Sequence, residues 1–164
     1  MKINKEGIDL IKHFESLHDG DLKLIGLQPK MDPIGIWTEG YGRAMRDDKG
    51  NFIKGESNKS LAYSRVTIRT EEQALKALLE DLSSREHIVV QNIKVALNDN
   101  QFSSLVSYVY NTGGSSSLYK LINTKSSEKN IREWFTTHYI TGGGVPLKGL
   151  ILRRKAEADL FFKK

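Results

Sequence analysis

Apolar side chains near the start of the chain recur with the spacing of a helix. Ile8 and Ile11 stand three positions apart, and Glu15 falls four positions later on the same stripe. Asn4 is a favourable N-cap residue, so the pattern predicts a first helix over about residues 5 to 17. Glu15 should therefore lie at the edge of a core, where its carboxylate is partly removed from water.

The segment after this helix loses the helical spacing. Residues 18 to 31 contain two glycines and a proline, which is typical of a loop or an irregular hairpin. Short runs with strand character follow over residues 34 to 41 and residues 51 to 54, joined by a turn around residues 48 to 50. These runs predict a small antiparallel sheet.

From Thr70 onward the pattern becomes helical. Thr70 and Gln73 have the spacing of a capping box, and leucines and alanines follow at helical intervals. Glycines 142 to 144 predict a hinge-like loop. Three further helices are predicted: one from the polar break at residues 98–101 to Gly113, one opened by Ser127, and a last one with Pro146 in its first turn that ends near Phe162.

These elements predict an α+β, mainly helical protein, and 164 residues suffice for one domain with a sizeable core. We expect a small N-terminal lobe with a short antiparallel sheet over about residues 1 to 70. A larger helical lobe is expected over about residues 71 to 164. A cleft between two such lobes is a natural place for an extended ligand.

Composition excludes several functional classes. The chain has no cysteine, and its four histidines lack metal-ligand spacing, so we expect neither a disulfide nor a metal site. Residues 1 to 14 carry five charged residues, unlike a signal peptide, so we expect synthesis and folding in a cytoplasm. A net charge of +5 favours an anionic partner, whether cell wall, membrane surface or nucleic acid.

Two carboxylates flank the irregular segment. Glu15 closes the first helix, Asp32 stands at the mouth of a glycine-rich turn, and Thr38 follows six positions later. Cleavage of a glycosidic bond needs two carboxylates in different environments, because one protonates the leaving oxygen while the other manages the attacking water. The pattern therefore indicates glycoside hydrolysis.

These residues resemble the active-site segment of phage-type lysozymes, the endolysins that cut bacterial peptidoglycan. The similar residues are Phe14-Glu15 and Asp32-Pro33-Ile34-Gly35-Ile36-Trp37-Thr38-Glu39-Gly40-Tyr41-Gly42. Residues 98 to 113 look like the central helix of that family, and residues 142 to 161 look like its C-terminal signature. The order of the four segments also fits, so the resemblance covers most of the chain and implies a lysozyme-like fold.

The resemblance implies three catalytic residues. Glu15 would be the general acid, Asp32 would orient or activate water in an inverting reaction, and the Thr38 hydroxyl would bind the same water. The loop before Asp32 is longer than in well-known relatives, so Asp19 and Asp21 compete for its role.

The family pattern implies five substrate-binding residues: Gly40, Gly42, Tyr110, Asn111 and Arg154. The glycines would let the backbone approach sugar rings, while the aromatic and the amide would grip a sugar and its N-acetyl group. Of the adjacent arginines Arg153 and Arg154, one is expected to pair with Glu15 or bind peptide carboxylates, and the other to be solvated. The structural alternatives are turn glycines and an ordinary helix end.

The function so implied is hydrolysis of the β-1,4 bond between N-acetylmuramic acid and N-acetylglucosamine in peptidoglycan glycan strands, by a monomer that needs no cofactor. Two alternatives are a lytic transglycosylase on the same substrate and a non-catalytic wall-binding module. Scattered basic residues and the absence of a recognition motif disfavour nucleic acid as a partner.

Two expectations concern where the protein acts. The resemblance implies a phage origin and holin-type release from the host cytoplasm to the periplasmic peptidoglycan. The C-terminal helix ends in Lys163 and Lys164, which suits either a closing helix of the core or contact with an anionic outer-membrane surface.

Overall fold

The computed structural model describes all residues from Met1 to Lys164. Contacts divide the chain into two compact units. The sheet unit comprises Glu15–Asp81, and the helical unit comprises Met1–Phe14 together with Leu82–Lys164. The first fourteen residues therefore pack with the C-terminal helices, although the sequence analysis expected a lobe boundary near residue 70.

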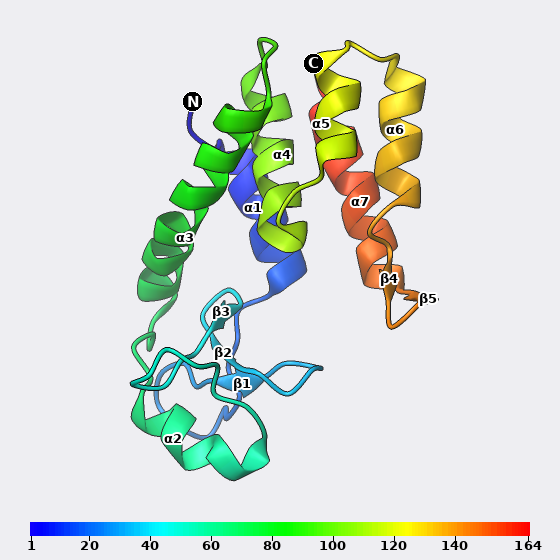
Figure 1. Ribbon diagram of the computed structural model, residues 1–164. Helices are drawn as coiled ribbons and strands as arrows, with labels where there is room; N and C mark the ends of the chain where they lie inside the picture. Colours follow the sequence, from blue (N-terminus) through cyan, green and yellow to red (C-terminus); the bar gives the residue numbers. More distant parts are fainter. The chain divides into compact units, whose positions relative to one another are not determined.

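Figure 1 labels the elements in chain order. The helices are α1 (Lys5–Glu15), α2 (Lys59–Ser64), α3 (Glu71–Asn92), α4 (Asp99–Thr112), α5 (Ser116–Asn123), α6 (Glu128–Thr137) and α7 (Lys148–Phe161), with a short 3₁₀ turn at Glu56–Asn58. The strands are β1 (Lys30–Met31), β2 (Trp37–Glu39), β3 (Arg43–Ala44), β4 (Thr141–Gly142) and β5 (Val145–Pro146). The α+β, mainly helical class predicted from the sequence is confirmed.

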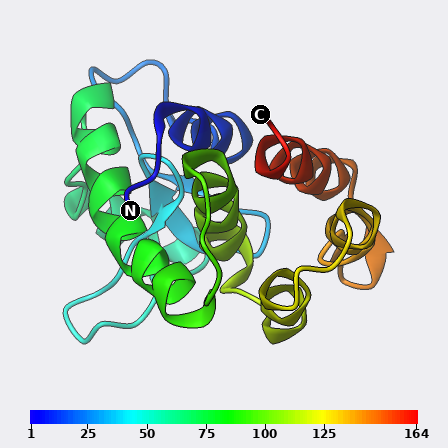
Figure 2. The same ribbon diagram turned by 90° about the horizontal axis from the view of Figure 1, so that it is seen from above.

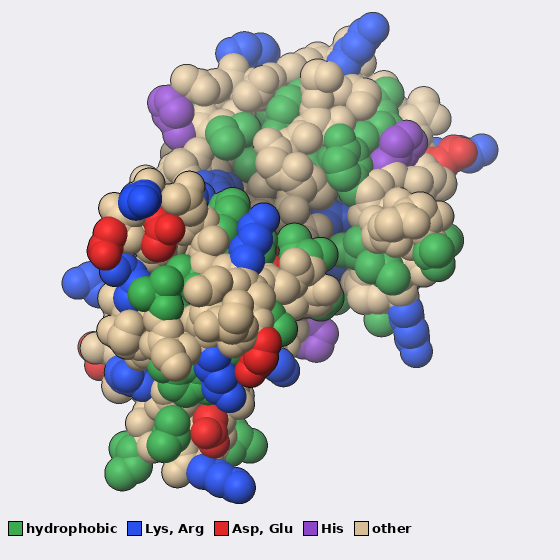
Figure 3. Space-filling view, turned by 60° about the horizontal axis from the view of Figure 1, so that its bottom comes forward, with side chains coloured by type: hydrophobic (Ala, Val, Ile, Leu, Met, Phe, Trp, Pro, Cys, Tyr) green, Lys and Arg blue, Asp and Glu red, His purple; other side chains and the backbone are tan.

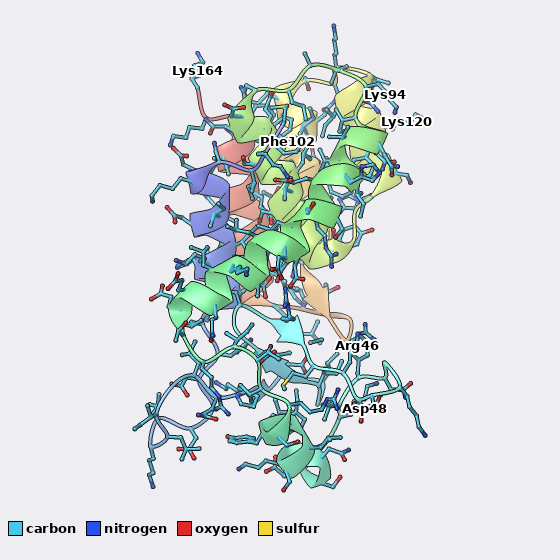
Figure 4. All side chains as sticks on the ribbon, turned by 90° about the vertical axis from the view of Figure 1, so that its left-hand side faces the viewer. Arg46, Asp48, Lys94, Phe102, Lys120 and Lys164 are labelled. Carbon is cyan, nitrogen blue, oxygen red and sulfur yellow. The ribbon has the colours of Figure 1, made fainter.

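The sheet unit contains a three-stranded antiparallel sheet in the order β1-β2-β3. One face of this sheet packs on a small core. Its buried members are Trp37, Met45, Ile53 and Ala62, and Met31, Tyr63 and Val66 pack against them. On the nearby hairpin, Arg46 and Asp48 are solvent-exposed (Figure 4), and Arg65 pairs with Asp48 at 2.5 Å.

Helix starts predicted from capping residues are confirmed. The Asn4 side chain accepts the N–H of Gly7 at 3.0 Å. Thr70 Oγ1 accepts the N–H of Gln73 at 3.1 Å, and Gln73 Oε1 accepts the N–H of Thr70 at 3.2 Å. A full capping box also opens α4 at Asn98. These bonds satisfy N–H groups that the first helical turn leaves without a partner.

The helical unit is built around α4 and α7, which pack on each other. Helix α6 packs on α7 and also on α5, as Figure 2 shows from above. Phe102 on α4 is buried in this unit (Figure 4). The core also includes Leu105, Val106, Tyr108, Leu118, Phe135 and Phe161.

The first helix ends at Glu15 and not at the predicted residue 17, and the predicted start of the last helix is also wrong. Pro146 does not lie in the first turn of α7; it lies in β5 and pairs with Thr141 of β4. Gly143 and Gly144 adopt positive φ values of 59° and 81°, which closes a tight hairpin between the two strands. Because the hairpin takes Pro146 as a strand residue, the helix begins at Lys148.

Candidate active site

Side chains alternate between the two faces of the β1–β2 hairpin. Met31 lies opposite Trp37, and both side chains belong to the small core. Lys30 lies opposite Thr38, so these two side chains project from the other face. We call this second face the polar face of the hairpin.

Asp32 extends the polar face by one position. Its N–H donates to the carbonyl oxygen of Ile36 at 2.8 Å, which continues the register of the two strands. Asp32 and Thr38 are thus diagonal neighbours on one face, at positions whose Cα atoms are usually about 7–8 Å apart. The hairpin register thus assigns to one face the two residues that the sequence analysis paired.

The carboxylate of Asp32 is held by its own turn. Oδ1 accepts the N–H groups of Ile34 at 3.0 Å and Ile36 at 2.8 Å. Gly35 has a φ of 84°, and its N–H donates to the Asp32 carbonyl oxygen at 3.0 Å. Both carboxylate hydrogen bonds go to one oxygen, so Oδ2 is left for an external donor such as water.

The Thr38 side chain is also fixed. It is 5% exposed, and Oγ1 donates to the carbonyl oxygen of Lys30 at 2.9 Å. Since the hydroxyl proton is used in that bond, the oxygen retains acceptor capacity. The group can therefore accept a hydrogen bond from a water on the polar face.

Glu15 stands at the C-terminal end of α1, where Ser16 adopts a left-handed φ of 60° and ends the helix. The Glu15 side chain is half-buried. Its Oε2 lies 3.0 Å from the point that a β-carbon on Gly42 would occupy. Gly42 itself has a φ of 85°, so both backbone conformation and space call for glycine there.

Gly40 is explained by packing within the sheet unit. A β-carbon on Gly40 would stand 2.9 Å from Ile68 Cδ1, and its φ is 59°. The Gly-Tyr-Gly turn is thus shaped by Glu15 on one side and Ile68 on the other. Its contact with sugar remains a prediction.

The two competing aspartates serve the loop between α1 and β1. Asp19 Oδ1 accepts the N–H of Gln28 at 3.3 Å, and Asp21 Oδ1 accepts the N–H of Lys23 at 3.0 Å. The Asp21 bond is a turn contact of the kind that aspartate commonly makes, whereas the Asp19 bond crosses the loop between residues nine positions apart. They favour Asp32 as the second carboxylate of the site.

The sequence analysis did not predict the contacts of Glu39 and His18. Glu39 is 5% exposed, and its carboxylate accepts the N–H groups of Thr67 at 2.9 Å and Ile68 at 3.1 Å, which fastens the segment before α3 to β2. The backbone N–H of His18 donates to the Gly40 carbonyl oxygen at 2.8 Å. No sequence motif around either residue predicts these long-range contacts.

In the helical unit, Arg154 joins Asn111 to a buried carboxylate. Its guanidinium donates to Asn111 Oδ1 and to Glu157, which also accepts from Arg153 at 3.2 Å and from Ser107 Oγ at 2.8 Å. Burial raises the pKa of Glu157, although both arginines act in the opposite direction. The expectation that one arginine is solvated is wrong, because Arg153 and Arg154 are 3% and 0% exposed.

Tyr110 and Asn111 lie in the last turn of α4. The Tyr110 ring is half-buried with the Arg85 guanidinium 5.9 Å from its centroid, whereas Asn111 is exposed. Gly113 caps the helix in the left-handed conformation at a φ of 82°. The amide at this helix end is thus both anchored by Arg154 and open to solvent.

Arg43 on β3 is held by acidic side chains of α3. Its guanidinium makes two hydrogen bonds to Asp81, at 2.9 and 3.0 Å, one to Glu80 at 3.3 Å and one to the Ala77 carbonyl oxygen at 2.7 Å. Burial opposes the charged form, but Asp81 and then Glu80 outweigh it and raise the pKa of Arg43. The side chain ties β3 to α3.

No helix has the length and apolar character needed to cross a membrane. No three histidine, aspartate or glutamate side chains are grouped as metal ligands.

Comparisons with known proteins agree with one another. A family model for phage lysozyme matches residues 23–157. An endolysin of Acyrthosiphon pisum secondary endosymbiont phage 1 is 30% identical over 168 residues, which cover 98% of each chain. An endolysin from Escherichia coli O157:H7 phage FAHEc1 matches with a TM-score of 0.73 and 30% identity, over 99% of this chain and 94% of that one.

A further solved structure is the muramidase domain of SpmX from Asticaccaulis excentricus. It matches with a TM-score of 0.74 and 26% identity, over 99% of both chains. The family model begins eight residues after Glu15, but the endolysin alignment covers 98% of the chain. The chain therefore belongs to the phage lysozyme family and is a lysozyme-type glycoside hydrolase with a role in peptidoglycan lysis.

Proposed function

We propose that the protein hydrolyses the β-1,4 bond between N-acetylmuramic acid and N-acetylglucosamine with Glu15 as general acid and Asp32 and Thr38 as the water-binding pair. The observation that carries the proposal is the state of Asp32. Its turn holds Oδ1 with two backbone N–H groups and leaves Oδ2 for water, on the same hairpin face as Thr38.

The two acceptors would orient the attacking water. A water that donates one hydrogen to Asp32 Oδ2 and the other to Thr38 Oγ1 directs an oxygen lone pair away from both. As that oxygen bonds to the anomeric carbon, Asp32 takes the water proton, and Glu15 gives its proton to the leaving glycosidic oxygen. The carboxyls then exchange protons with solvent, and the anomeric configuration is inverted.

We also propose Gly40, Gly42, Tyr110, Asn111 and Arg154 as substrate-binding residues. Arg154 donates to Asn111 Oδ1, which orients the amide so that its Nδ2 hydrogens remain for another acceptor. An N-acetyl carbonyl is an acceptor of this kind. Arg154 itself is fully buried, so we assign it the indirect role of holding Asn111.

Clearing of purified peptidoglycan tests the proposal, with wild-type protein beside Glu15→Gln and Asp32→Asn. Wild type should clear the suspension and release products with free reducing ends, and both variants should lose most of this activity. Products with anhydro ends and an active Asp32→Asn variant would instead identify a lytic transglycosylase. Binding without clearing by wild type would identify a wall-binding module.

At the cellular level, we propose that the whole chain forms one lysozyme-like domain that acts as a monomer. It would be made in the host cytoplasm and reach the periplasmic peptidoglycan after holin-type release. Basic and acidic side chains are interspersed on the face drawn in Figure 3, which favours diffuse attraction to an anionic wall over a nucleic-acid-binding stripe.

We also propose contact of the C-terminal helix with an anionic outer-membrane surface. Lys164 extends from the end of the chain (Figure 4), but Lys163 lies 3.5 Å from a Glu6 carboxylate oxygen. Leu160 and Phe161 are buried, so charge alone would drive the contact. The double substitution Lys163→Gln and Lys164→Gln should reduce killing of intact cells more than clearing of purified peptidoglycan. An equal loss in both assays would contradict a membrane role.

A further inference from the structure

Tyr139 lies in the turn between α6 and β4, and its backbone is left-handed at a φ of 56°. Helix α6 has already ended there, because the preceding His138 is extended at a φ of −114° and a ψ of 147°. The left-handed conformation is therefore not part of a helix cap. A bulky residue seldom adopts such a backbone, and strain of this kind gathers at binding sites, where the surrounding structure holds it.

Lys125, the other left-handed residue of the helical unit that is not glycine, has an ordinary explanation. It follows α5 with a φ of 53°, and its N–H donates to the Ile122 carbonyl oxygen at 3.0 Å. The N–H of Ser126 donates to the Leu121 carbonyl oxygen at 3.0 Å. These two bonds form the Schellman motif, which commonly ends helices. Lys125 therefore ends α5, whereas Tyr139 has no such role at the end of α6.

The Tyr139 ring packs on two aromatic partners, yet the residue is 47% exposed. Its ring centroid lies 5.8 Å from that of Tyr108, with the planes at 89°, and 6.0 Å from that of Trp134, with the planes at 41°. Tyr108 and Trp134 are themselves buried. Tyr139 is thus an aromatic ring held by the core that offers part of its surface to a ligand, at a low cost in conformational entropy.

The buried Tyr108 connects this ring to the amide assigned to the substrate. The central carbon of the Arg154 guanidinium lies 5.1 Å from the Tyr108 ring centroid, and the same guanidinium donates to Asn111 Oδ1. Tyr139 and Asn111 are both open to solvent. The contact between Tyr108 and Arg154 therefore supports an exposed ring and an exposed amide together.

We propose, building on the substrate-binding role proposed above for Asn111, that Tyr139 is a further binding residue for the glycan strand, with its ring packed against a sugar ring. One face of an N-acetylhexosamine presents C–H groups, which suit the apolar face of an aromatic ring. The hydroxyls at the rim of the sugar suit the phenolic hydroxyl. An amide for the N-acetyl group and a ring for the sugar face match two features that repeat along this polymer.

The first experiment measures the dissociation constant of a soluble glycan fragment of peptidoglycan, with every variant made in a Glu15→Gln background so that the fragment is not cut. Tyr139→Leu should weaken binding about three- to tenfold, as expected for loss of an aromatic contact. Tyr139→Phe keeps the ring and should bind within about twofold of the parent. Unchanged binding by Tyr139→Leu, or an equal loss in Tyr139→Phe, would overturn the proposal.

The second experiment separates binding from stability. Tyr139→Gly and Tyr139→Ala both lack the ring, but only glycine adopts a φ of 56° without strain, so Tyr139→Gly should have the higher melting temperature. Both should lose the same affinity. Affinity that recovers together with stability in Tyr139→Gly would show that Tyr139 acts only through the fold, and would overturn the proposal.

Lys125→Gly is the matched control for backbone strain. It relieves a similar left-handed conformation in the same unit, so it should raise the melting temperature and leave the dissociation constant of the glycan fragment unchanged.

The rate of clearing is an independent readout in protein that retains Glu15. The Tyr139 ring supplies contact and no proton, so Tyr139→Leu should raise the half-saturating concentration of peptidoglycan and leave the maximal rate nearly unchanged. A lower maximal rate with unchanged saturation would overturn the binding role. Failure of the proposed function would appear differently, as lysis by Glu15→Gln or Asp32→Asn.

Discussion

The carboxylate of Glu15 occupies the space that a side chain on Gly42 would need, with Oε2 only 3.0 Å from the position of its β-carbon. Gly42→Ala should therefore displace the proposed acid as well as strain the backbone at a φ of 85°. We expect at least a tenfold loss of lysis and about 1–2 kcal/mol of lost stability. Clearing assays and denaturant unfolding measure the two effects.

Gly50→Ala is the matched control. Gly50 has a similar φ of 82° but no atom within 4 Å of the added β-carbon. It should lose a similar amount of stability and keep near wild-type lysis. Equal losses of activity in the two variants would show that strain, and not contact with Glu15, is what matters at Gly42.

Glu15→Gln should abolish lysis while preserving the fold. The amide retains the size of the side chain but has no proton to donate to a glycosidic oxygen. Its melting temperature should stay close to that of wild type or rise, because a half-buried carboxylate is costlier than a neutral amide. Lysis above about a tenth of wild type would remove Glu15 as the acid; Glu6→Gln on the exposed side of α1 is the control.

Asp32→Asn should reduce the rate at least about a hundredfold, within the range usual for loss of a positioned base. The amide oxygen can still accept the N–H groups of Ile34 and Ile36, so the turn should persist. Asp19→Asn and Asp21→Asn should lower the rate less than about threefold, because both carboxylates accept backbone N–H groups within the loop and an asparagine oxygen can accept the same bonds. Equal sensitivity at Asp19 or Asp21 would show that the long loop has been misaligned.

Arg43→His should add a pH dependence to the free energy of unfolding that the permanently charged Arg43 does not contribute. Asp81 and Glu80 would raise the imidazole pKa above its unfolded value of about 6.5, so the pairing would be present below that pH and lost as pH rises through the folded value. At pH 8 the variant should be less stable than wild type by about 1–3 kcal/mol.

Urea unfolding at pH 5.5 and pH 8 measures this difference. Arg65→His is the control, because its partner Asp48 has an 88% exposed side chain and such pairs contribute little. If the free energy of unfolding of Arg43→His does not change between the two pH values, the contacts to Asp81 do not stabilise the fold.

Local features of the sequence predict the helices well. The caps at Asn4 and Thr70 each depend on residues within one turn, and both form as expected. Pro146 misleads because its fixed φ suits a helix start as well as an edge strand, and only the glycine turn before it decides. Helices α2 and α5, at six and eight residues, are too short to show a clear period.

The site is only partly visible in the sequence. Asp32 and Thr38 are found because their spacing belongs to a known pattern, and the hairpin register brings them to one face. Strand β1 lies at the end of the segment predicted as a loop or an irregular hairpin, and its two residues gain strand geometry only by pairing with β2. His18 and the buried Arg153 depend on contacts that no local pattern encodes.

The grouping of α1 with the C-terminal helices constrains the order in which the protein can fold during its synthesis. The N–H of Asn4 donates to Ser103 Oγ at 2.8 Å, and the N–H of Ile3 donates to Glu86 at 2.9 Å. The first helix must therefore wait for partners made much later, whereas Glu15–Asp81 can assemble from neighbouring segments as it leaves the ribosome. A ribosome-bound chain that ends before α4 should hold a sheet unit and an undocked first helix, so a complete lysozyme exists only once translation is nearly finished.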